Sequence, residues 1–265
     1  MLTSGQIAHF ETFGFVILRQ VFNAEEVAIM RRESDEIFAE DRNGGPARNE
    51  IGRLQKVPYI GVQPFFELKP YLSTLPEDDR IYEIGVDLLG PDFILGQTEG
   101  RSRAGDTPWH GGETYELGTV KINFYLDELT KDTGALRFVP GSHKYSDPDR
   151  YDLLRPRNDD PDFRPFGMKP SETPCYAAET LPGDLVIFTE NVLHSSFGGS
   201  PGRQQHAINF MENPKTDEQV AYIKSLYKRW KYGLRPTESY VNSDRPRIRR
   251  MVSRLVELGF ETSKV

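Results

Sequence analysis

The chain has 265 residues, a formal net charge of −7 at pH 7 and a sequence pI near 5.4. This acidic balance argues against a partner that is a nucleic-acid polymer, although a local basic patch can still hold an anionic small molecule. The N-terminus lacks the basic and apolar segments of a signal peptide, and no apolar run reaches the roughly 18 residues of a membrane span. Cys175 is the only cysteine. Because it has no partner for an internal disulfide, we expect a reducing cytoplasm. Because no run is apolar and long enough to span a membrane, we expect no membrane partner.

The length suits a single domain over residues 1–265. The run 13–18 is apolar and β-branched, which predicts a strand. Asn23 and the acidic residues after it predict the start of a helix that continues to about Phe38. A second helix is predicted over 78–89, since Gly90 and a proline follow it. Between them, 41–52 is charged and rich in glycine, which indicates a loop that can cover an active site.

Short apolar runs separated by turn residues follow, at 93–97, 119–126, 135–139, 184–189 and 206–211. This pattern predicts a mainly β fold with flanking helices, whose core over about 92–211 is a double-stranded β-helix, a cupin-like jelly roll. The segment 144–170 is predicted to be an insertion that shapes a pocket. From 217 onward the pattern is helical again, with Asp244 as the N-cap of a last helix that stops at Gly259. We interpret the arginines of that helix as a solvated face.

The run His110-Gly111-Gly112-Glu113 is the most informative stretch. On a strand, residues i and i+2 point to one face, and a His-x-Asp pair with a distant second histidine forms the facial triad of non-heme Fe(II) oxygenases. Here Gly112 stands where the aspartate is expected. Glu113 falls on the opposite face unless the backbone bulges. The pattern therefore predicts an iron site with an open coordination position.

Three blocks carry a family resemblance: GDTPWHGGE at 105–113, VKINFYLDELTKDTGALRFVPGSH at 120–143 and PGDLVIFTENVLHSSFGGSPGRQQHAINF at 182–210. With the opening at 10–27 and the closing RMVSRLVELGF at 250–260, they resemble the phytanoyl-CoA dioxygenase family of Fe(II)/2-oxoglutarate oxygenases. The resemblance covers most of the chain, and these ordered parts are specific only in combination.

The resemblance implies that His110 and His194 bind Fe(II) and that Arg203 binds the C5 carboxylate of 2-oxoglutarate, with O2 as cosubstrate. It also marks Gly112 as a departure, because the family normally has aspartate there. Glycine or alanine at this position is typical of the Fe(II)/2-oxoglutarate halogenases, which bind chloride in the vacated place. Chloride balances the charge that a carboxylate would otherwise supply.

Weaker candidates surround this set. Thr107 and Gln97 are candidate cosubstrate contacts, although threonine and glutamine also satisfy ordinary turn and strand hydrogen bonds. The candidate substrate contacts are polar or cationic and stand close to the metal blocks or on a predicted inward strand face: Arg101, Glu113, Asn123, Tyr125 and Arg137.

The preferred hypothesis is a halogenase that chlorinates an unactivated aliphatic C–H bond of a small metabolite in specialised metabolism. The cations before and after the metal block allow an anionic substrate such as a nucleotide or an amino acid. Two alternatives stay open: a hydroxylase in which Glu113 or water completes the iron shell, and a catalytically silent binding protein. The intact histidines and arginine argue against the silent protein. The oligomeric state is not predicted.

Overall fold

The computed structural model describes residues 1–42, 59–111, 116–144, 164, 167–229 and 234–264. The described α-helices are α1 (Ser4–Phe13), α2 (Ala24–Arg42), α4 (Asp79–Leu89), α6 (Asp217–Arg229), α7 (Glu238–Val241) and α8 (Pro246–Glu257). Short 3-10 helices are η1 (Phe66–Leu68), η2 (Leu72–Glu77), η3 (Ser142–Lys144) and η5 (Pro170–Glu172). The strands are β1 (Phe15–Leu18), β2 (Tyr59–Val62), β3 (Phe93–His110), β4 (Thr119–Tyr125), β5 (Leu136–Phe138), β6 (Tyr176–Ala178), β7 (Leu185–Phe188) and β8 (His194–Glu212).

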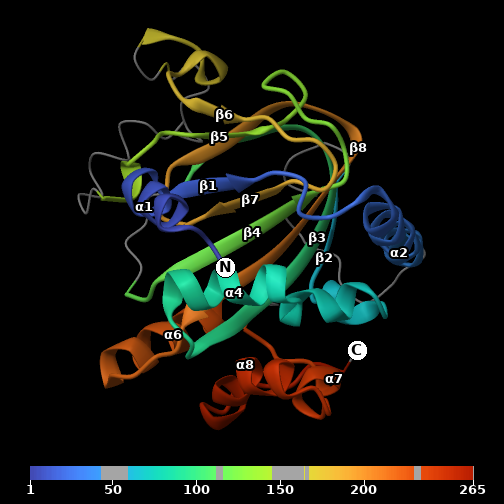
Figure 1. The fold of residues 1–265 in the computed structure, drawn as a ribbon, viewed down its shortest axis with the longest axis vertical. Coiled ribbons are helices and arrows are strands. Elements are labelled where there is room, and N and C mark those ends of the chain that lie inside the picture. Colours follow the sequence, from blue (N-terminus) through green and yellow to red (C-terminus); the bar gives the residue numbers. More distant parts are fainter. Residues whose placement is uncertain (43–58, 112–115, 145–163, 165–166, 230–233, 265) are drawn as a thin grey trace.

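The described strands form one eight-stranded sheet in the order β1-β7-β4-β8-β3-β2, and β5 joins it by pairing with β8 and β6. Every one of these strand pairs is antiparallel. In Figure 1, β5 and β6 lie at one end of the molecule, and helices α4, α6, α7 and α8 gather at the other. The mainly β architecture with flanking helices is therefore as expected from the sequence.

Strands β3 and β8 are much longer than the runs 93–97 and 206–211 that hydrophobicity alone marked. Register shifts interrupt their pairing near Gly105, where φ is 76°. Opposite this region, Gly198 has φ 74°, and a Cβ there would collide with the carbonyl of Asp132. Glycine is therefore required at this bend. Beyond the bend, the N-terminal end of β8 pairs with β5, whereas its C-terminal half pairs with β4.

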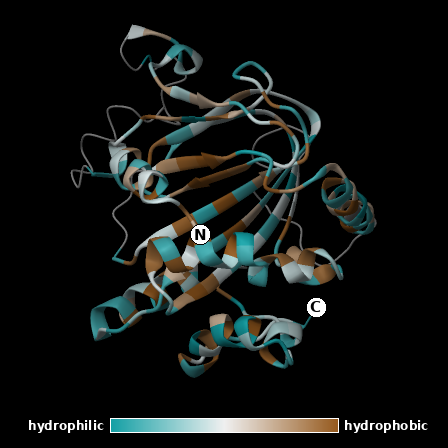
Figure 2. Ribbon diagram, viewed as in Figure 1, coloured by the Kyte–Doolittle hydropathy of each residue, from teal (hydrophilic) through white to brown (hydrophobic). Residues whose placement is uncertain are grey.

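The two faces of β3, β8 and β4 differ in chemistry. Apolar side chains on one face, among them Ile122, Phe124, Ile208 and Phe210, pack in the main core with residues of α2, α4 and α8. Successive side chains on a strand point to opposite faces, so the residues between them face the other way, into the barrel. Figure 2 shows the resulting mixture of hydrophobic and hydrophilic colour along β4, whereas β1 and β7 are uniformly hydrophobic.

The helix starts follow local capping chemistry. The Asn23 side chain accepts from the amides of Glu25 and Glu26 at 2.9 and 3.0 Å, and α2 begins as predicted. Asp78 likewise caps α4 by accepting from the Arg80 amide. The predicted cap of the last helix is wrong by one residue: Arg245 is the N-cap of α8, because Pro246 occupies the first helical turn, where its missing N–H costs nothing. Helix α1 was not predicted.

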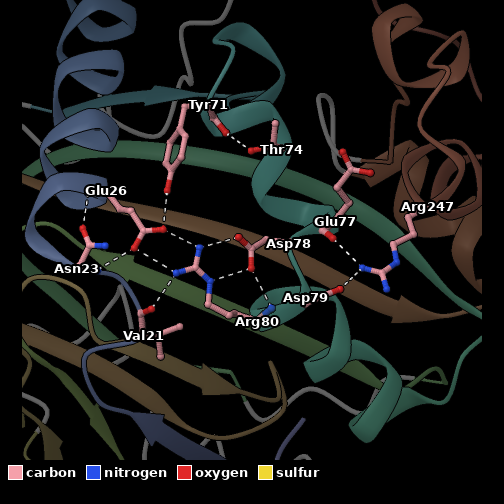
Figure 3. A network of polar contacts seen from close by, with 10 residues as sticks. All are labelled: Val21, Asn23, Glu26, Tyr71, Thr74, Glu77, Asp78, Asp79, Arg80 and Arg247. Atoms are coloured by element: carbon pink, nitrogen blue, oxygen red, sulfur yellow. Dashed lines mark hydrogen bonds and ion pairs between the residues drawn. The ribbon is translucent and has the colours of Figure 1, made fainter.

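Ion pairs attach the helices to one another (Figure 3). The Arg80 guanidinium pairs with Glu26 of α2 at 2.8 Å and with Asp78 at 2.7 Å. Arg247 pairs with Asp79 at 2.5 Å, and Arg245 pairs with Glu77 at 2.9 Å. The arginines at the start of α8 therefore dock this helix onto η2 and α4, which corrects their interpretation as a solvated face.

The predicted loop at 41–52 lies almost wholly outside the described residues, and so does most of the insertion predicted at 144–170. Within the described part of the chain, no helix combines the length and apolarity needed to cross a membrane.

Candidate metal centre

Two histidines meet where the long strands β3 and β8 converge. His110 ends β3, His194 begins β8, and the two are paired in register. Their ring centroids are 4.1 Å apart with an interplanar angle of 51°. In each ring Nδ1–H donates to the carbonyl two residues earlier, at 2.9 Å to Pro108 O and at 2.8 Å to Val192 O. The lone pair of each Nε2 is therefore available for a metal.

The surroundings keep both rings neutral. Desolvation, and to a lesser degree the charges of Arg101, Lys121 and Arg103, lower the pKa of His110 to about 4. Burial places the pKa of His194 well below its ordinary value, and a charge on His110 would lower it again. His194 packs against the ring of Phe188 at 4.8 Å between centroids. Metal binding requires neutral imidazoles, so this environment favours it.

Gly111 turns the chain directly after the first histidine. Its φ is 94°, and a Cβ there would lie 3.0 Å from both Glu190 O and His194 Nδ1. The strand thus ends at His110, and strand alternation does not extend to Glu113. The parity argument that directed Glu113 away from the metal therefore fails, because it assumed a continuous strand.

Gly112 and Glu113 lie outside the described residues, so the halide position and the role of Glu113 remain predictions. Within the described ranges, no group of three or more histidine, cysteine, aspartate or glutamate residues is placed to hold a metal ion. Among the described residues, the candidate metal ligands are therefore the imidazoles of His110 and His194.

Arg203 lies inside the barrel on β8 and is 3% exposed. One guanidinium nitrogen donates to Gly134 O, and a Cβ at Gly134 would collide with the guanidinium. Nε of Arg203 has no hydrogen-bond partner within the described structure. The Arg203 charge opposes the rise in the pKa of Tyr125 that burial causes, so the two side chains are neighbours. A buried guanidinium with spare donor capacity suits a carboxylate.

Two further candidates lie on the same side as these groups. Asn123 Nδ2 donates to the Tyr125 hydroxyl at 3.4 Å, while its Oδ1 has no partner among the described residues. Thr107 is paired in register with Ser196, whose hydroxyl donates to Thr107 Oγ1 at 3.1 Å. Because Ser196 and His194 are two apart on a strand, Thr107 lies on the histidine side.

The inward face of β3, β8 and β4 has a regular polar pattern. Gln97, Asn209 and Lys121 form one row across the three strands. The next rows are Glu99, Ala207 and Asn123, and then Arg101, Gln205 and Tyr125. Sequence reasoning did not select Glu99 or Asn209. Their signal is the polar alternation within each strand, but only the register shows that the three strands share a face.

A buried ion cluster occupies this face. Glu99 pairs with Lys121 and, at 2.5 Å, with Arg101, and it accepts from Gln63 Nε2 at 2.9 Å. Although desolvation opposes it, the Arg101 and Lys121 charges bring the pKa of Glu99 down to about 2. Glu190, four residues before His194, lies 3.7 Å from the Lys121 ammonium, and burial raises the pKa of its carboxyl.

The structure does not bring Arg137 to the histidine pair. Its neighbour on β5, Phe138, faces inward toward His194, so Arg137 faces the other way. Its guanidinium donates to the carbonyls of Ser171 and Lys131 and stacks over Phe197 at 5.1 Å. Arg137 therefore holds loops together on the outside of the barrel. Arg101, by contrast, lies within the polar face.

Comparisons with known proteins bear on the family and the fold. A family model described as phytanoyl-CoA dioxygenase matches residues 97–204. The chain is 23% identical over 222 residues to an ectoine dioxygenase of Sphingopyxis alaskensis, covering 74% of this chain and 71% of that one. HygX from Streptomyces hygroscopicus, solved with nickel and 2-oxoglutarate bound, has a TM-score of 0.62 at 20% identity, covering 82% of this chain and 90% of that one. The 2-oxoglutarate-dependent epimerase SnoN from nogalamycin biosynthesis also has a TM-score of 0.62, at 20% identity, covering 79% of this chain and 80% of that one.

These matches confirm the family resemblance and the expected double-stranded β-helix fold. The family match, which spans Gln97 to Gln204, contains His110, His194 and Arg203. The expected class, a non-heme iron and 2-oxoglutarate-dependent oxidoreductase, is confirmed with it.

Proposed function

We propose that this protein, a member of the phytanoyl-CoA dioxygenase family, is an Fe(II)/2-oxoglutarate-dependent halogenase that chlorinates an aliphatic C–H bond of a small polar metabolite. The observation that carries the proposal is the pair of neutral imidazoles, to which the described residues add no carboxylate, followed by glycine at position 112. Three cations, Arg101, Arg103 and Lys121, act on His110 electrostatically. Such a positive environment favours an anion beside the metal.

The residues present fit the cofactors. Nε2 of His110 and Nε2 of His194 would hold the iron, since both Nδ1 atoms are already occupied as donors. Arg203 would take the distal carboxylate of 2-oxoglutarate, and its Nε has no hydrogen-bond partner within the described structure. Iron with 2-oxoglutarate and O2 supplies hydrogen-atom abstraction and transfer of a halogen or a hydroxyl group. The protein's part is to orient the substrate and to exclude water around the buried His194.

Charge balance supports chloride as the remaining ligand. Two imidazoles bring no charge to a divalent metal, and dianionic 2-oxoglutarate does not supply the further anion that an aspartate gives in a hydroxylase. A halide in place of that aspartate restores the same total. Glycine also leaves the space that an ion needs.

Chloride is expected to tighten 2-oxoglutarate binding and to enter the product. In the companion variant Gly112→Asp, a carboxylate should exclude the halide and shift any surviving turnover toward hydroxylation. Mass spectrometry of products from a panel of small metabolites, with chloride, with bromide and without halide, measures this.

Wild-type protein in halide-free buffer is the matched control for the variant. An oxygenated product that forms with stoichiometric succinate and does not change with halide would exclude halogenation of that substrate. Absence of any Fe(II)-dependent succinate from wild-type protein would instead favour the catalytically silent binding protein.

A hydroxylase is the second candidate, because Gly111 ends the strand and removes the geometric reason for directing Glu113 away from the iron. In that case Glu113→Gln should greatly weaken Fe(II) binding. The halogenase hypothesis expects Glu113→Gln to retain iron, because the side chain is then not a ligand. Iron content after gel filtration, compared with that of a His194→Ala variant, distinguishes the two.

A further inference from the structure

Glu99 is a buried carboxylate that contacts two cations on the inward face of the barrel. Its side chain is 1% exposed, contacts the Lys121 ammonium and pairs with the Arg101 guanidinium at 2.5 Å. Gln63 Nε2 donates to it at 2.9 Å. Although burial opposes ionisation, the charges of Arg101 and Lys121 hold the pKa of Glu99 at about 2. Glu99 is therefore ionised at neutral pH and is a counter-charge that both cations share.

Lys121 connects this carboxylate to the metal centre. Across the β4–β7 pair, Lys121 is the register partner of Phe188. Partner residues of an antiparallel pair share one face of the sheet, with Cβ atoms about 5 Å apart. The Phe188 ring in turn packs against the His194 ring at 4.8 Å between centroids. Lys121 and His194 are therefore both neighbours of one aromatic ring.

A second connection runs through Glu190. Its carboxylate lies 3.7 Å from the Lys121 ammonium. The Glu190 carbonyl lies 3.0 Å from the place that a Cβ of Gly111 would take, and so does His194 Nδ1. The segment that contacts Lys121 thus packs directly against the metal centre. Burial raises the pKa of the Glu190 carboxyl, which favours its neutral form and makes Glu99 the stronger counter-charge of Lys121.

The cations of this cluster act on both candidate metal ligands. Burial is the main cause of the lowered pKa of His110 and of His194, and the charges of Arg101 and Lys121 contribute to both. A cation that disfavours a proton on an imidazole also disfavours a divalent metal bound to it, because proton and metal are both positive. A carboxylate that pairs with these cations reduces this repulsion.

We propose that Glu99 is a positioning residue of the metal centre: it holds Lys121 and Arg101 on the inward face and, through their charges, sets the affinity of the two histidines for the metal. The cations favour an anionic ligand beside the metal, while Glu99 limits their repulsion of the metal itself. This role rests on the proposed function for the metal at His110 and His194, and it adds a residue that binds neither the metal nor the cosubstrate.

Fe(II) binding without turnover tests the proposal. Fe(II) is titrated by calorimetry into the anaerobic protein, without 2-oxoglutarate and in halide-free buffer. Glu99→Gln preserves the size of the side chain and an acceptor oxygen for Gln63 but removes the charge, so Fe(II) affinity should fall by a factor on the order of ten. Lys121→Met removes an opposing cation and should raise the affinity by a similar factor. These directions do not depend on the net charge of this face, because each variant changes a single charge.

The double variant separates an electrostatic role from a structural one. Glu99→Gln combined with Lys121→Met restores the net charge of the wild-type cluster, so its Fe(II) affinity should return toward that of wild type. A purely structural role predicts the reverse, since two disruptions of one buried cluster weaken binding at least as much as one does. Glu11→Gln and Lys131→Met change exposed side chains by the same charges and should bind Fe(II) as wild type does.

Weaker Fe(II) binding in both single variants, or unchanged binding in both, overturns the proposal. A double variant that binds Fe(II) less well than Glu99→Gln overturns it too. Should Glu99→Gln fail to fold, the change in Lys121→Met decides alone, because that variant leaves Glu99 with Arg101 and Gln63.

Chloride, titrated into protein loaded with Fe(II) and 2-oxoglutarate, keeps this result apart from the proposed function. Tighter chloride binding in Glu99→Gln and weaker binding in Lys121→Met, the opposite order to that for Fe(II), supports the role of Glu99. Wild-type protein that binds Fe(II) but no chloride refutes the halogenase, and the Fe(II) comparison then still decides whether Glu99 acts on the metal.

Discussion

Replacing His194 by alanine is expected to abolish Fe(II)-dependent succinate formation, with a loss of more than about 100-fold. The reason is geometric: the described residues offer two imidazoles, and removing one leaves a single ligand that cannot retain the metal. His110→Ala should behave in the same way. Iron content and 2-oxoglutarate turnover, measured on the same preparations, test both variants.

Two further variants make this result specific. His9→Gln changes an exposed histidine at the N-terminus and should leave iron binding intact. Arg203→Ala should retain iron but raise the KM for 2-oxoglutarate, because it removes a charge-assisted pair and not a ligand. Full activity in His194→Ala would refute the assignment of the metal centre.

The second large effect concerns acid stability and arises from His206. This residue is 0% exposed, and neither ring nitrogen has a hydrogen-bond partner within the described structure. The rings of Phe38, Phe65 and Phe66 surround it at centroid distances of 6.3, 4.8 and 6.4 Å. Burial, and to a lesser degree the charge of Arg31, lowers the pKa of His206 to about 3.

The direction of the pH effect follows from these values. The unfolded histidine has a pKa near 6.5, so below this pH the unfolded chain takes up a proton that the folded chain refuses. Above about pH 6.5 both states hold a neutral His206, so the part of the free energy of unfolding that depends on its protonation is at its maximum. Below that pH, protonation of His206 in the unfolded chain lowers the free energy of unfolding by about 1.4 kcal/mol per pH unit, until the pH reaches the folded pKa.

His206→Leu is therefore expected to flatten the acid limb of the stability curve. Urea unfolding of metal-free wild type and variant, at pH values from about 7.5 down to 4, gives the free energy of unfolding of each. The difference between the two proteins should be constant near neutrality and should grow in favour of the variant below about pH 6.5. The comparison cancels the titration of the other buried groups. A difference that does not vary with pH would show that His206 is not protonated on unfolding in this range.

Local chemistry was readable from the sequence alone. The caps at Asn23 and Asp78 act through side-chain bonds to amides two or three residues away, so the helix starts of α2 and α4 follow from their own residues. The family resemblance of the blocks also predicted roles for His110, His194 and Arg203, and the structure pairs the two histidines in register and buries the arginine.

Only the tertiary structure shows which residues share a face of the sheet and where a strand ends, because both depend on strand register and on bends in the strands. Glu99 and Asn209 are 110 positions apart in the chain, and only the pairing of β3 and β8 with β4 places them on one face with Lys121. Arg137 was predicted to contact substrate because of its charge, but its strand position directs it outward. Gly111 shows the same limit: the sequence reveals neither its positive φ nor that the carbonyls of Glu190 and Val192 lie where a Cβ would be. Strand alternation describes a residue only as far as the strand continues, and tertiary packing decides where it ends.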